Sequence, residues 1–385
     1  MTEYVRYLKQ TEKPFAPRLE QLDFELTERC NNDCLHCCIN LPANDADARR
    51  RELTTAQVKD ILRQAAELGF LQVRFTGGEP LLRPDFNELY LHARRLGLKV
   101  LLYTNGCLLT PHLADLFARV PPLQKIEITV YGMRPESYGA VTRTPGSFAQ
   151  FRRGVDLLLQ RAVPFIVKGA LLPQNRPEMG EFEAWARTIP WMSRRPVYAL
   201  FFNFRDRRDD AGRNRLIESL RLTPQEGVSL LMRDEEAHRE IAAFAAKFTG
   251  LPGDRLFKCS VCQGRNVSID AYGRAQPCMN IRAPELTVDM AGLEERASLQ
   301  DALESFTRLS DLRATNPDYL RRCARCFLNG LCEQCPATSW TEHGVLDRPV
   351  EYLCGVAHAL AQTMGWLDEG ENSWEVRNWR ERITS

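Results

Sequence analysis

Four cysteines fall within nine positions near the start of the sequence: Cys30, Cys34, Cys37 and Cys38, in ELTERCNNDCLHCCIN. Three thiolates with the spacing C-x3-C-x2-C on one short loop can bind one face of a [4Fe–4S] cluster. Such a cluster then keeps one iron without a protein ligand, and an open position is what a catalytic metal site requires. Zinc is the alternative, because thiolates bind both metals, and Cys38 or His36 could then supply a fourth ligand.

Eight of the 13 cysteines lie further along the chain, between positions 259 and 354. In a large chain without an export signal, such a density indicates metal or redox chemistry rather than disulfides. Eight thiols are enough for two fully ligated [4Fe–4S] clusters or for two zinc sites with four thiolates each. The eight residues are Cys259, Cys262, Cys278, Cys323, Cys326, Cys332, Cys335 and Cys354. We expect the two cysteines that remain, Cys38 and Cys107, to be buried apolar residues.

The composition argues against several classes of partner. The 385 residues include 51 basic and 50 acidic side chains, a net charge of +1, which gives no electrostatic reason to expect binding to nucleic acid or to a membrane surface. No apolar run approaches the ~20 residues that a transmembrane helix needs. The first residues, MTEYVRYLKQTEKPF, contain no apolar signal core. We therefore expect a soluble cytoplasmic protein.

Strands and helices alternate through the first half of the sequence. Apolar, β-prone segments predict strands at 22–26, 71–75, 99–103, 125–130, 165–170 and 198–204. Amphipathic patterns predict helices at 54–70, 85–96, 111–119, 147–161 and 178–188, the first capped by Thr54 with Gln57 three positions later. This order indicates parallel β/α units. Six strands fit an open or partial barrel better than a closed barrel of eight units, and the chemistry of either lies at the C-terminal ends of the strands.

The pattern changes after the turn-rich segment GLPGDR at 250–255. We expect a long helix at 223–249, a β-hairpin from 266–269 and 275–278, a helix near 298–309, and then a cysteine-rich coil. The charged segment FRDRRDDAGRNR at 204–215 favours a solvated loop over a substrate clamp. The predicted organisation is an N-terminal extension (1–20), a barrel (21–235), a bridging helix or linker (236–255) and a cysteine-rich domain with a C-terminal tail (256–385).

The segment RFTGGEP, Arg74–Pro80, follows the second predicted strand. Paired glycines let the backbone approach a ligand closely, and Glu79 could accept hydrogen bonds from an ammonium group. In this order after C-x3-C-x2-C, the motif resembles the radical S-adenosylmethionine (SAM) superfamily, over roughly residues 20–235. The resemblance implies an α/β fold with a partial (β/α)6 TIM-like barrel. It also implies that the open iron chelates SAM, whose reductive cleavage gives a 5′-deoxyadenosyl radical that abstracts a hydrogen atom from the substrate.

The same resemblance implies roles for particular residues. The cluster ligands would be Cys30, Cys34 and Cys37, and the methionyl amine of SAM would be held by Gly77, Gly78 and Glu79.

Five further residues are candidate SAM contacts by this resemblance. His36 stands where the family often has an aromatic residue near the adenine, and Asn105 of YTNG would contact the ribose. Thr129 lies in ITVYG, where a tyrosine replaces the usual acidic residue of that strand end. Arg143 is a candidate for the SAM carboxylate and Lys168 for another polar contact, with a surface or barrel-rim charge as the alternative for both.

The later cysteines resemble the SPASM domain that follows many radical SAM barrels. Cys262-x10-Gly273-x4-Cys278 matches the hairpin of that domain, and CARCFLNGLCEQC matches its C-x2-C-x5-C, although the next gap has two residues instead of the usual three. The resemblance implies two auxiliary [4Fe–4S] clusters, which makes three clusters in all. The ligands would be Cys259, Cys262, Cys278 and Cys335 for the first auxiliary cluster, and Cys323, Cys326, Cys332 and Cys354 for the second.

Proteins of this architecture mostly modify ribosomally made peptides or proteins, by crosslinking, epimerisation, decarboxylation or oxidation of a side chain. The resemblance therefore implies a peptide maturase that acts on a peptide or protein and takes electrons from a donor such as flavodoxin or ferredoxin. Only about 20 residues precede the first strand, too few for the winged-helix domain that binds leader peptides in many maturases. We therefore expect a separate protein or another surface to bind any leader.

Several alternatives stay open. Haem-modifying enzymes share the barrel, the SPASM domain and a short N-terminus, so a tetrapyrrole is the main competing substrate, and dehydrogenation of a small alcohol is a third possibility. A non-catalytic electron carrier or zinc scaffold is the alternative of another class, but the three-cysteine first site argues against it. Sulfatase maturation is disfavoured, because Met279 and Asn280 follow Cys278 where those enzymes usually have an acidic residue.

Overall fold

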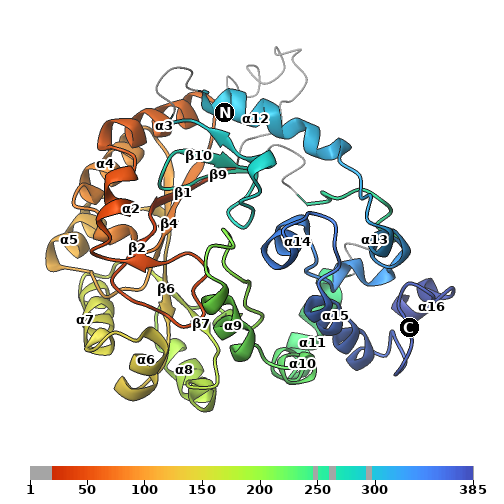
Figure 1. Cartoon of the computed structure of the whole chain (residues 1–385). Coiled ribbons are helices and arrows are strands. Elements are labelled where there is room, and N and C mark those ends of the chain that lie inside the picture. Colours follow the sequence, from red (N-terminus) through yellow and green to blue (C-terminus); the bar gives the residue numbers. More distant parts are fainter. Residues whose placement is uncertain (1–19, 246–249, 260–265, 292–296, 385) are drawn as a thin grey trace, which may run out of the picture.

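Nine strands form one continuous sheet in the order β11-β10-β9-β1-β4-β5-β6-β7-β8 (Figure 1). The structure is a computed structural model that describes residues 20–245, 250–259, 266–291 and 297–384. Every neighbouring pair from β9 through β1 to β8 is parallel, whereas β10 is antiparallel to both of its neighbours, β9 and β11. The strands are β1 (Gln21–Thr27), β4 (Gln72–Gly77), β5 (Lys99–Thr104), β6 (Leu123–Val130), β7 (Ile166–Ala170), β8 (Tyr198–Ala199), β9 (Asn266–Ile269), β10 (Arg274–Gln276) and β11 (Val288–Asp289).

Helices cover the outer face of the parallel strands, as the alternating pattern predicted (Figure 1). The predicted cap of the first long helix is confirmed, because Thr54 and Gln57 form a capping box. Two short helices, α2 and α6, were not predicted. The helices of this part are α2 (Ala46–Arg51), α3 (Thr55–Glu67), α4 (Phe86–Arg95), α5 (Pro111–Arg119), α6 (Pro135–Thr142), α7 (Ser147–Gln160) and α8 (Met179–Ala186).

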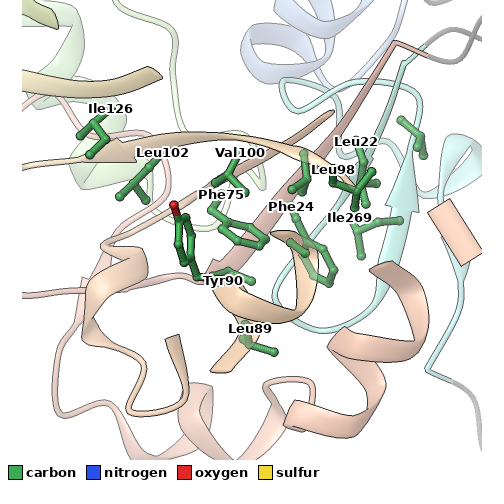
Figure 2. Close-up of a cluster of buried hydrophobic side chains, with 14 of the residues drawn as sticks. Leu22, Phe24, Phe75, Leu89, Tyr90, Leu98, Val100, Leu102, Ile126 and Ile269 are labelled. Atoms are coloured by element: carbon green, nitrogen blue, oxygen red, sulfur yellow. The ribbon is translucent and has the colours of Figure 1, made fainter. Parts of the chain in front are cut away.

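Side chains alternate along β1 between an apolar core and a polar barrel interior. Leu22 and Phe24 are fully buried and pack with side chains of β4, β5 and α4 (Figure 2). Asp23 and Glu25 lie between them in sequence and therefore point to the opposite face, into the barrel. Both are buried. Two faces of different chemistry explain why this strand lacks the continuous apolar run of an ordinary buried parallel strand.

The hairpin of the C-terminal region extends the barrel sheet. β9 pairs with β1 in parallel, from Gln21 opposite Asn266 to Phe24 opposite Ile269. Ile269 joins the same apolar core as Leu22 (Figure 2). The barrel and the cysteine-rich region therefore share a sheet and a core across the predicted boundary near residue 256.

The rest of the C-terminal region is helical between its cysteines, so the predicted coil is wrong. Short helices form because local caps are available, as at Ser298, whose side chain makes a capping box with Asp301. The helices are α12 (Leu299–Phe306), α13 (Pro317–Arg321), α14 (Pro336–His343), α15 (Glu351–Thr363) and α16 (Trp379–Thr384). The predicted architecture, a partial barrel followed by a cysteine-rich region with a hairpin, is confirmed.

Three predictions between the barrel and the hairpin need correction. The sixth predicted strand keeps only two paired residues in β8. The long helix predicted at 223–249 is two helices, α10 (Pro224–Leu231) and α11 (Glu235–Ala245), because Asp234 caps a new helix start at 3.0 Å from the Ala237 amide; residues 246–249 lie outside the described part. The charged segment at 204–215 is not a solvated loop, since Asp206 is 3% exposed and α9 (Ala211–Leu220) begins within it.

No helix among the described residues combines the length and apolar character needed to cross a membrane.

The glycine pair at the end of β4 lets two strand ends meet. The Gly78 amide donates to the Thr27 carbonyl at 2.7 Å, and the Glu79 amide donates to the Arg29 carbonyl at 2.9 Å. A Cβ atom on Gly77 would lie 2.2 Å from the Thr27 oxygen, and one on Gly78 would lie 2.3 Å from the Arg29 oxygen. Only glycine allows this approach, which places Glu79 directly beside the segment that leads to Cys30.

Gly78→Ala is therefore expected to push these two strand ends apart. The contacts are with backbone atoms that cannot rotate away, so we expect a loss of about 3 kcal/mol in the free energy of unfolding. Gly180→Ala in α8 is the matched control, because no atom lies within 4 Å of its added Cβ, and alanine should stabilise that helix by about 0.5–1 kcal/mol. Thermal unfolding of both variants tests this, and equal midpoints would contradict the assigned role of the glycine pair.

Candidate active site

The three predicted cluster cysteines lie on one loop at the C-terminal end of β1, the edge where barrel chemistry is expected. The base of the loop is closed by the pairing of β2 (Arg29–Cys30) with β3 (Leu41–Pro42). Its middle is fixed to the end of α6 by backbone hydrogen bonds from Asp33 and Leu35, at 2.9 and 3.0 Å. These contacts fix the backbone of the loop at its base and in its middle, and thereby the positions of its cysteines.

The three thiols are close enough to affect one another's pKa values. Burial raises the pKa of Cys34 well above its ordinary value, and the neighbouring Cys37 and Cys30 raise it further. The pKa of Cys30 is likewise raised, by burial and then by Glu79. Buried thiolates that repel one another need a bound cation.

The donor set of this loop consists of three thiols on one short segment. A zinc site would need its sulfurs about 2.3 Å from one ion, whereas the sulfurs that bind one face of a cubane are spread over three irons. Three thiols suit a [4Fe–4S] cluster by their chemistry, and ligation by Cys30, Cys34 and Cys37 stays a prediction.

Glu79 is a fully buried carboxylate beside this loop. One oxygen accepts from the Thr104 hydroxyl at 2.8 Å and from the Leu81 amide at 3.1 Å, and the other accepts from the Asn105 amide at 2.8 Å. Burial nevertheless raises its pKa to about 7. No cationic side chain of the described residues pairs with it, so a cationic group of a ligand would supply the missing charge. This fits the predicted contact with the ammonium group of SAM.

Asn105 points toward the cysteine loop. Its Oδ1 accepts from the Cys107 amide at 2.9 Å, and its Nδ2 lies 2.8 Å from Asn31 Oδ1 and 3.7 Å from Cys30 Sγ. Asn105 therefore links the end of β5 to the loop. Its contact with the ribose stays a prediction.

An aromatic wall borders the same loop. The His36 ring centroid lies 4.9 Å from that of Phe202 and 5.8 Å from that of Tyr131. Burial, and then Arg213, lower the pKa of His36 to about 4, so the imidazole is neutral at pH 7. Burial raises the pKa of Cys34, and Tyr131 opposes this shift. The wall is apolar enough for a flat ring to stack, which is compatible with the predicted adenine contact.

Arg143 already has a partner in the loop. It ends α6 with a positive φ of 52°, its Nε donates to the Asp33 carbonyl at 2.9 Å, and its guanidinium forms an ion pair with the Asp33 carboxylate. Arg213 contacts the same carboxylate at 2.6 Å. Arg143 would have to exchange this partner to bind the carboxylate of SAM, so that role stays a prediction.

Lys168 lies inside the barrel. Its Nζ is 3.2 Å from the ring centroid of Tyr103 and 3.3 Å from Glu127 Oε2. Burial lowers its pKa, although Glu127 opposes the shift. Thr129 on β6 is directly opposite Lys168 on β7. The rim position considered for Lys168 is therefore replaced by an interior one.

Two further residues continue this interior layer across the barrel. Arg74 on β4 pairs with Asp23 on β1 at 3.3 Å, and its guanidinium lies 4.9 Å from the ring centroid of Tyr103. We call Asp23, Arg74, Tyr103, Glu127 and Lys168 the interior belt. Its five residues lie on five neighbouring strands and make this part of the barrel interior polar.

Sequence reasoning missed a buried charged cluster where the barrel meets the hairpin. Arg282, 4% exposed at its side chain, forms an ion pair with Glu25 of β1 and lies 3.7 Å from Asp270 of the hairpin. Asp206 lies beside them: burial raises its pKa to about 8, Glu25 adds to this, and Arg282 opposes it. The charge of Asp206 also raises the pKa values of Cys38 and Cys278. Asp206 therefore lies between the first cysteine loop and the hairpin cysteine.

The later cysteines affect one another's pKa values in two sets, and their assignment to two clusters stays a prediction. Burial raises the pKa of Cys278 to about 12, and Cys335 and Cys259 raise it further; Cys262 lies outside the described residues. Burial raises the pKa of Cys323 to about 12, and Cys326 and Cys354 raise it further. Burial also raises the pKa of Cys332, and the same three cysteines add to that shift. A cavity of about 630 Å³ is lined by Cys259, Cys323, Cys326, Cys332, Cys335 and Cys354. A cavity with six thiols in its wall fits iron–sulfur clusters, and their number and ligands stay proposals.

Comparison with known proteins identifies the class. Residues 24–186 match the sequence model of the Radical SAM superfamily, a range that includes the cysteine loop, Glu79 and Asn105. This matched part of the chain is thus similar to the Radical SAM superfamily, and the chain as a whole shares its fold with anSMEcpe, an enzyme with a SPASM-type C-terminal region.

Two kinds of curated relative are similar to this chain. An AdoMet-dependent haem synthase of Methanosarcina barkeri is 32% identical over 164 residues, which are 43% of this chain and 45% of that protein. The chain thus spans less than half of the length of that relative. A PqqA peptide cyclase of Gluconobacter oxydans is 28% identical over 274 residues, which are 69% of this chain and 71% of the cyclase.

Solved structures show the same fold along most of the chain. Streptococcus suis SuiB bound to S-adenosylmethionine has a TM-score of 0.61 at 13% identity, covering 88% of this chain and 77% of SuiB. Native anSMEcpe with bound AdoMet also has a TM-score of 0.61 at 13% identity, covering 89% and 96%. SuiB has also been solved with its precursor peptide SuiA, at a TM-score of 0.57.

The raised pKa of Asp206 predicts how stability depends on pH. The folded state holds its proton up to about pH 8, whereas the unfolded chain releases it near 3.8. The stabilising effect of the protonated acid is therefore lost as pH rises between these values, at about 1.4 kcal/mol per pH unit. Asp206→Asn keeps the site neutral, so its stability relative to wild type should increase from pH 6 to pH 8.

Thermal unfolding at pH 6, 7 and 8 measures this difference. Asp156→Asn is the control, because Asp156 is exposed on α7. A difference between Asp206→Asn and wild type that stays constant with pH, or shrinks as pH rises, would show that Asp206 is not held in its neutral form.

Proposed function

We propose that this enzyme is a peptide maturase: it modifies a side chain of a peptide or protein by radical chemistry that starts from SAM. Oxidative modification, such as crosslinking, and epimerisation are both compatible with the site. The observation that carries the proposal is the fold. Similarity to SuiB, which has been solved with a precursor peptide, extends over barrel and C-terminal region together.

The length of the curated matches supports a peptide over a tetrapyrrole. The match to the haem synthase covers 43% of the chain. The match to the PqqA peptide cyclase covers 69%, which is more residues than 1–235 contain, so it extends into the C-terminal region.

The residues of the chain would divide the work as follows. Cys30, Cys34 and Cys37 would hold the cluster, and Glu79 would bind the ammonium group of SAM. The bound cluster and SAM supply the radical that removes hydrogen from the substrate. The interior belt lines the inside of the barrel with polar side chains, and a substrate would enter from the end where the cysteine loop lies.

The cysteines around the large cavity would hold two auxiliary clusters. Six of them line one continuous cavity, and Cys278 of the hairpin lies outside its lining but interacts electrostatically with Cys335 and Cys259. Full ligation by thiols would suit them to accept the second electron of an oxidative reaction and pass it to a partner such as flavodoxin or ferredoxin.

A direct test compares substrates. Anaerobically reconstituted protein with SAM and a reductant should release about tenfold more 5′-deoxyadenosine with a short peptide encoded beside its gene than with an iron porphyrin, and the peptide should change mass. Porphyrin turnover without peptide turnover would instead favour a haem-modifying enzyme.

The Cys30/Cys34/Cys37→Ala variant is the control for radical chemistry of any kind. It should release no 5′-deoxyadenosine with either substrate. Retained release would refute the role of the first cysteine site, whichever substrate the wild-type protein prefers.

A further inference from the structure

Asn105 is oriented by contacts on every polar atom. Its Oδ1 is occupied by the Cys107 amide at 2.9 Å, so its Nδ2 must face the cysteine loop. There it donates to Asn31 Oδ1 at 2.8 Å and lies 3.7 Å from Cys30 Sγ, within reach of a hydrogen bond to sulfur. Its backbone is fixed by Glu79 Oε2 at 2.8 Å. The side chain is 6% exposed, so water does not compete for these groups.

Cys30 needs such donors because of its surroundings. Its side chain is half-buried, and the carboxylate of Glu79 adds negative charge nearby. The Asn32 amide lies 3.4 Å from the same sulfur, so the backbone supplies one N–H donor and Asn105 supplies the only one that is a side chain among the described residues. Hydrogen bonds to ligand sulfurs withdraw negative charge and are among the factors that set the potential of an iron–sulfur cluster.

We infer that Asn105 is a positioning residue that donates a hydrogen bond to the sulfur of Cys30 and thereby raises the reduction potential of the first cluster. This rests on the proposed ligation by Cys30. It does not depend on the substrate class, because the potential is a property of the enzyme without substrate.

The test is a redox titration of the reconstituted holoenzyme followed by electron paramagnetic resonance. The signal of the first cluster is recognised because it alone changes when SAM is added. Asn105→Leu keeps the volume and removes the donor. At a fixed potential, the ratio of reduced to oxidised first cluster should fall about tenfold, which is 59 mV toward a more negative midpoint for a one-electron couple.

Asn175→Leu is the matched control. Asn175 is also 6% exposed, and its Oδ1 also accepts a backbone amide, from Leu172 at 2.8 Å, but its Nδ2 donates to carbonyl oxygens of Ala170 and Tyr131. Its substitution should disturb packing equally and leave the midpoint near that of wild type. Equal midpoints for Asn105→Leu and wild type, or equal shifts in both variants, would overturn the inference.

Asn105→Ala keeps the inference testable if Asn105→Leu does not assemble a cluster. This variant removes the same donor without adding bulk, and we expect it to lower the potential of the first cluster as well. An unchanged midpoint in Asn105→Ala would then overturn the inference. Loss of peptide turnover in wild-type protein would leave this measurement unaffected, so the two proposals fail separately.

Discussion

The meeting of the ends of β1 and β4 is the constraint on which the site depends. Two backbone hydrogen bonds, from Gly78 and Glu79, join the end of β4 to Thr27 and Arg29, which lead directly into the cysteine loop. This contact places a fully buried carboxylate beside three thiols that come from a different strand. Without it, the anionic groups would have no fixed separation, and a cluster and a cationic ligand could not be bound side by side.

Backbone and side-chain contacts also fix the position of the C-terminal region relative to the barrel. The hairpin joins the barrel sheet through β9, and the buried pair of Glu25 and Arg282 crosses the junction. A buried ion pair adds little net stability, because removing its charges from water is costly. Its value is specificity: the partners find each other in only one register of hairpin and barrel. The relative position of the first loop and Cys278 is thereby fixed by both backbone and side chains.

The sequence predicted those elements of the fold whose signals lie within a few neighbouring residues. The cap at Thr54, the first five strands and the hairpin each follow from residues close in sequence, and all are confirmed. The cysteine spacing and the GGEP segment identified the superfamily, because both lie on single loops. The short strand β8 and the break between α10 and α11 were missed, since an apolar pattern says nothing about how many residues find a partner.

The charged junction and the orientation of Asn105 could not be predicted from the sequence. Glu25, Asp206 and the pair Asp270 and Arg282 come from three segments far apart in the sequence, and no spacing rule joins them. The segment around Asp206 looked solvated because it is rich in charge, yet its charges are matched by partners that only the folded chain supplies. Asn105 was assigned to the ribose from its motif, whereas its neighbours in space are the Cys107 amide and the cysteine loop.

The central claim is that three thiols hold a cluster whose remaining iron is free to bind SAM. Electron–nuclear double resonance of the reduced protein, with SAM labelled at its amino nitrogen, tests this most directly. The account predicts a hyperfine coupling between the label and the first cluster. Zinc in place of that cluster, or a cluster signal with no coupling because a protein side chain occupies the last iron, would contradict it.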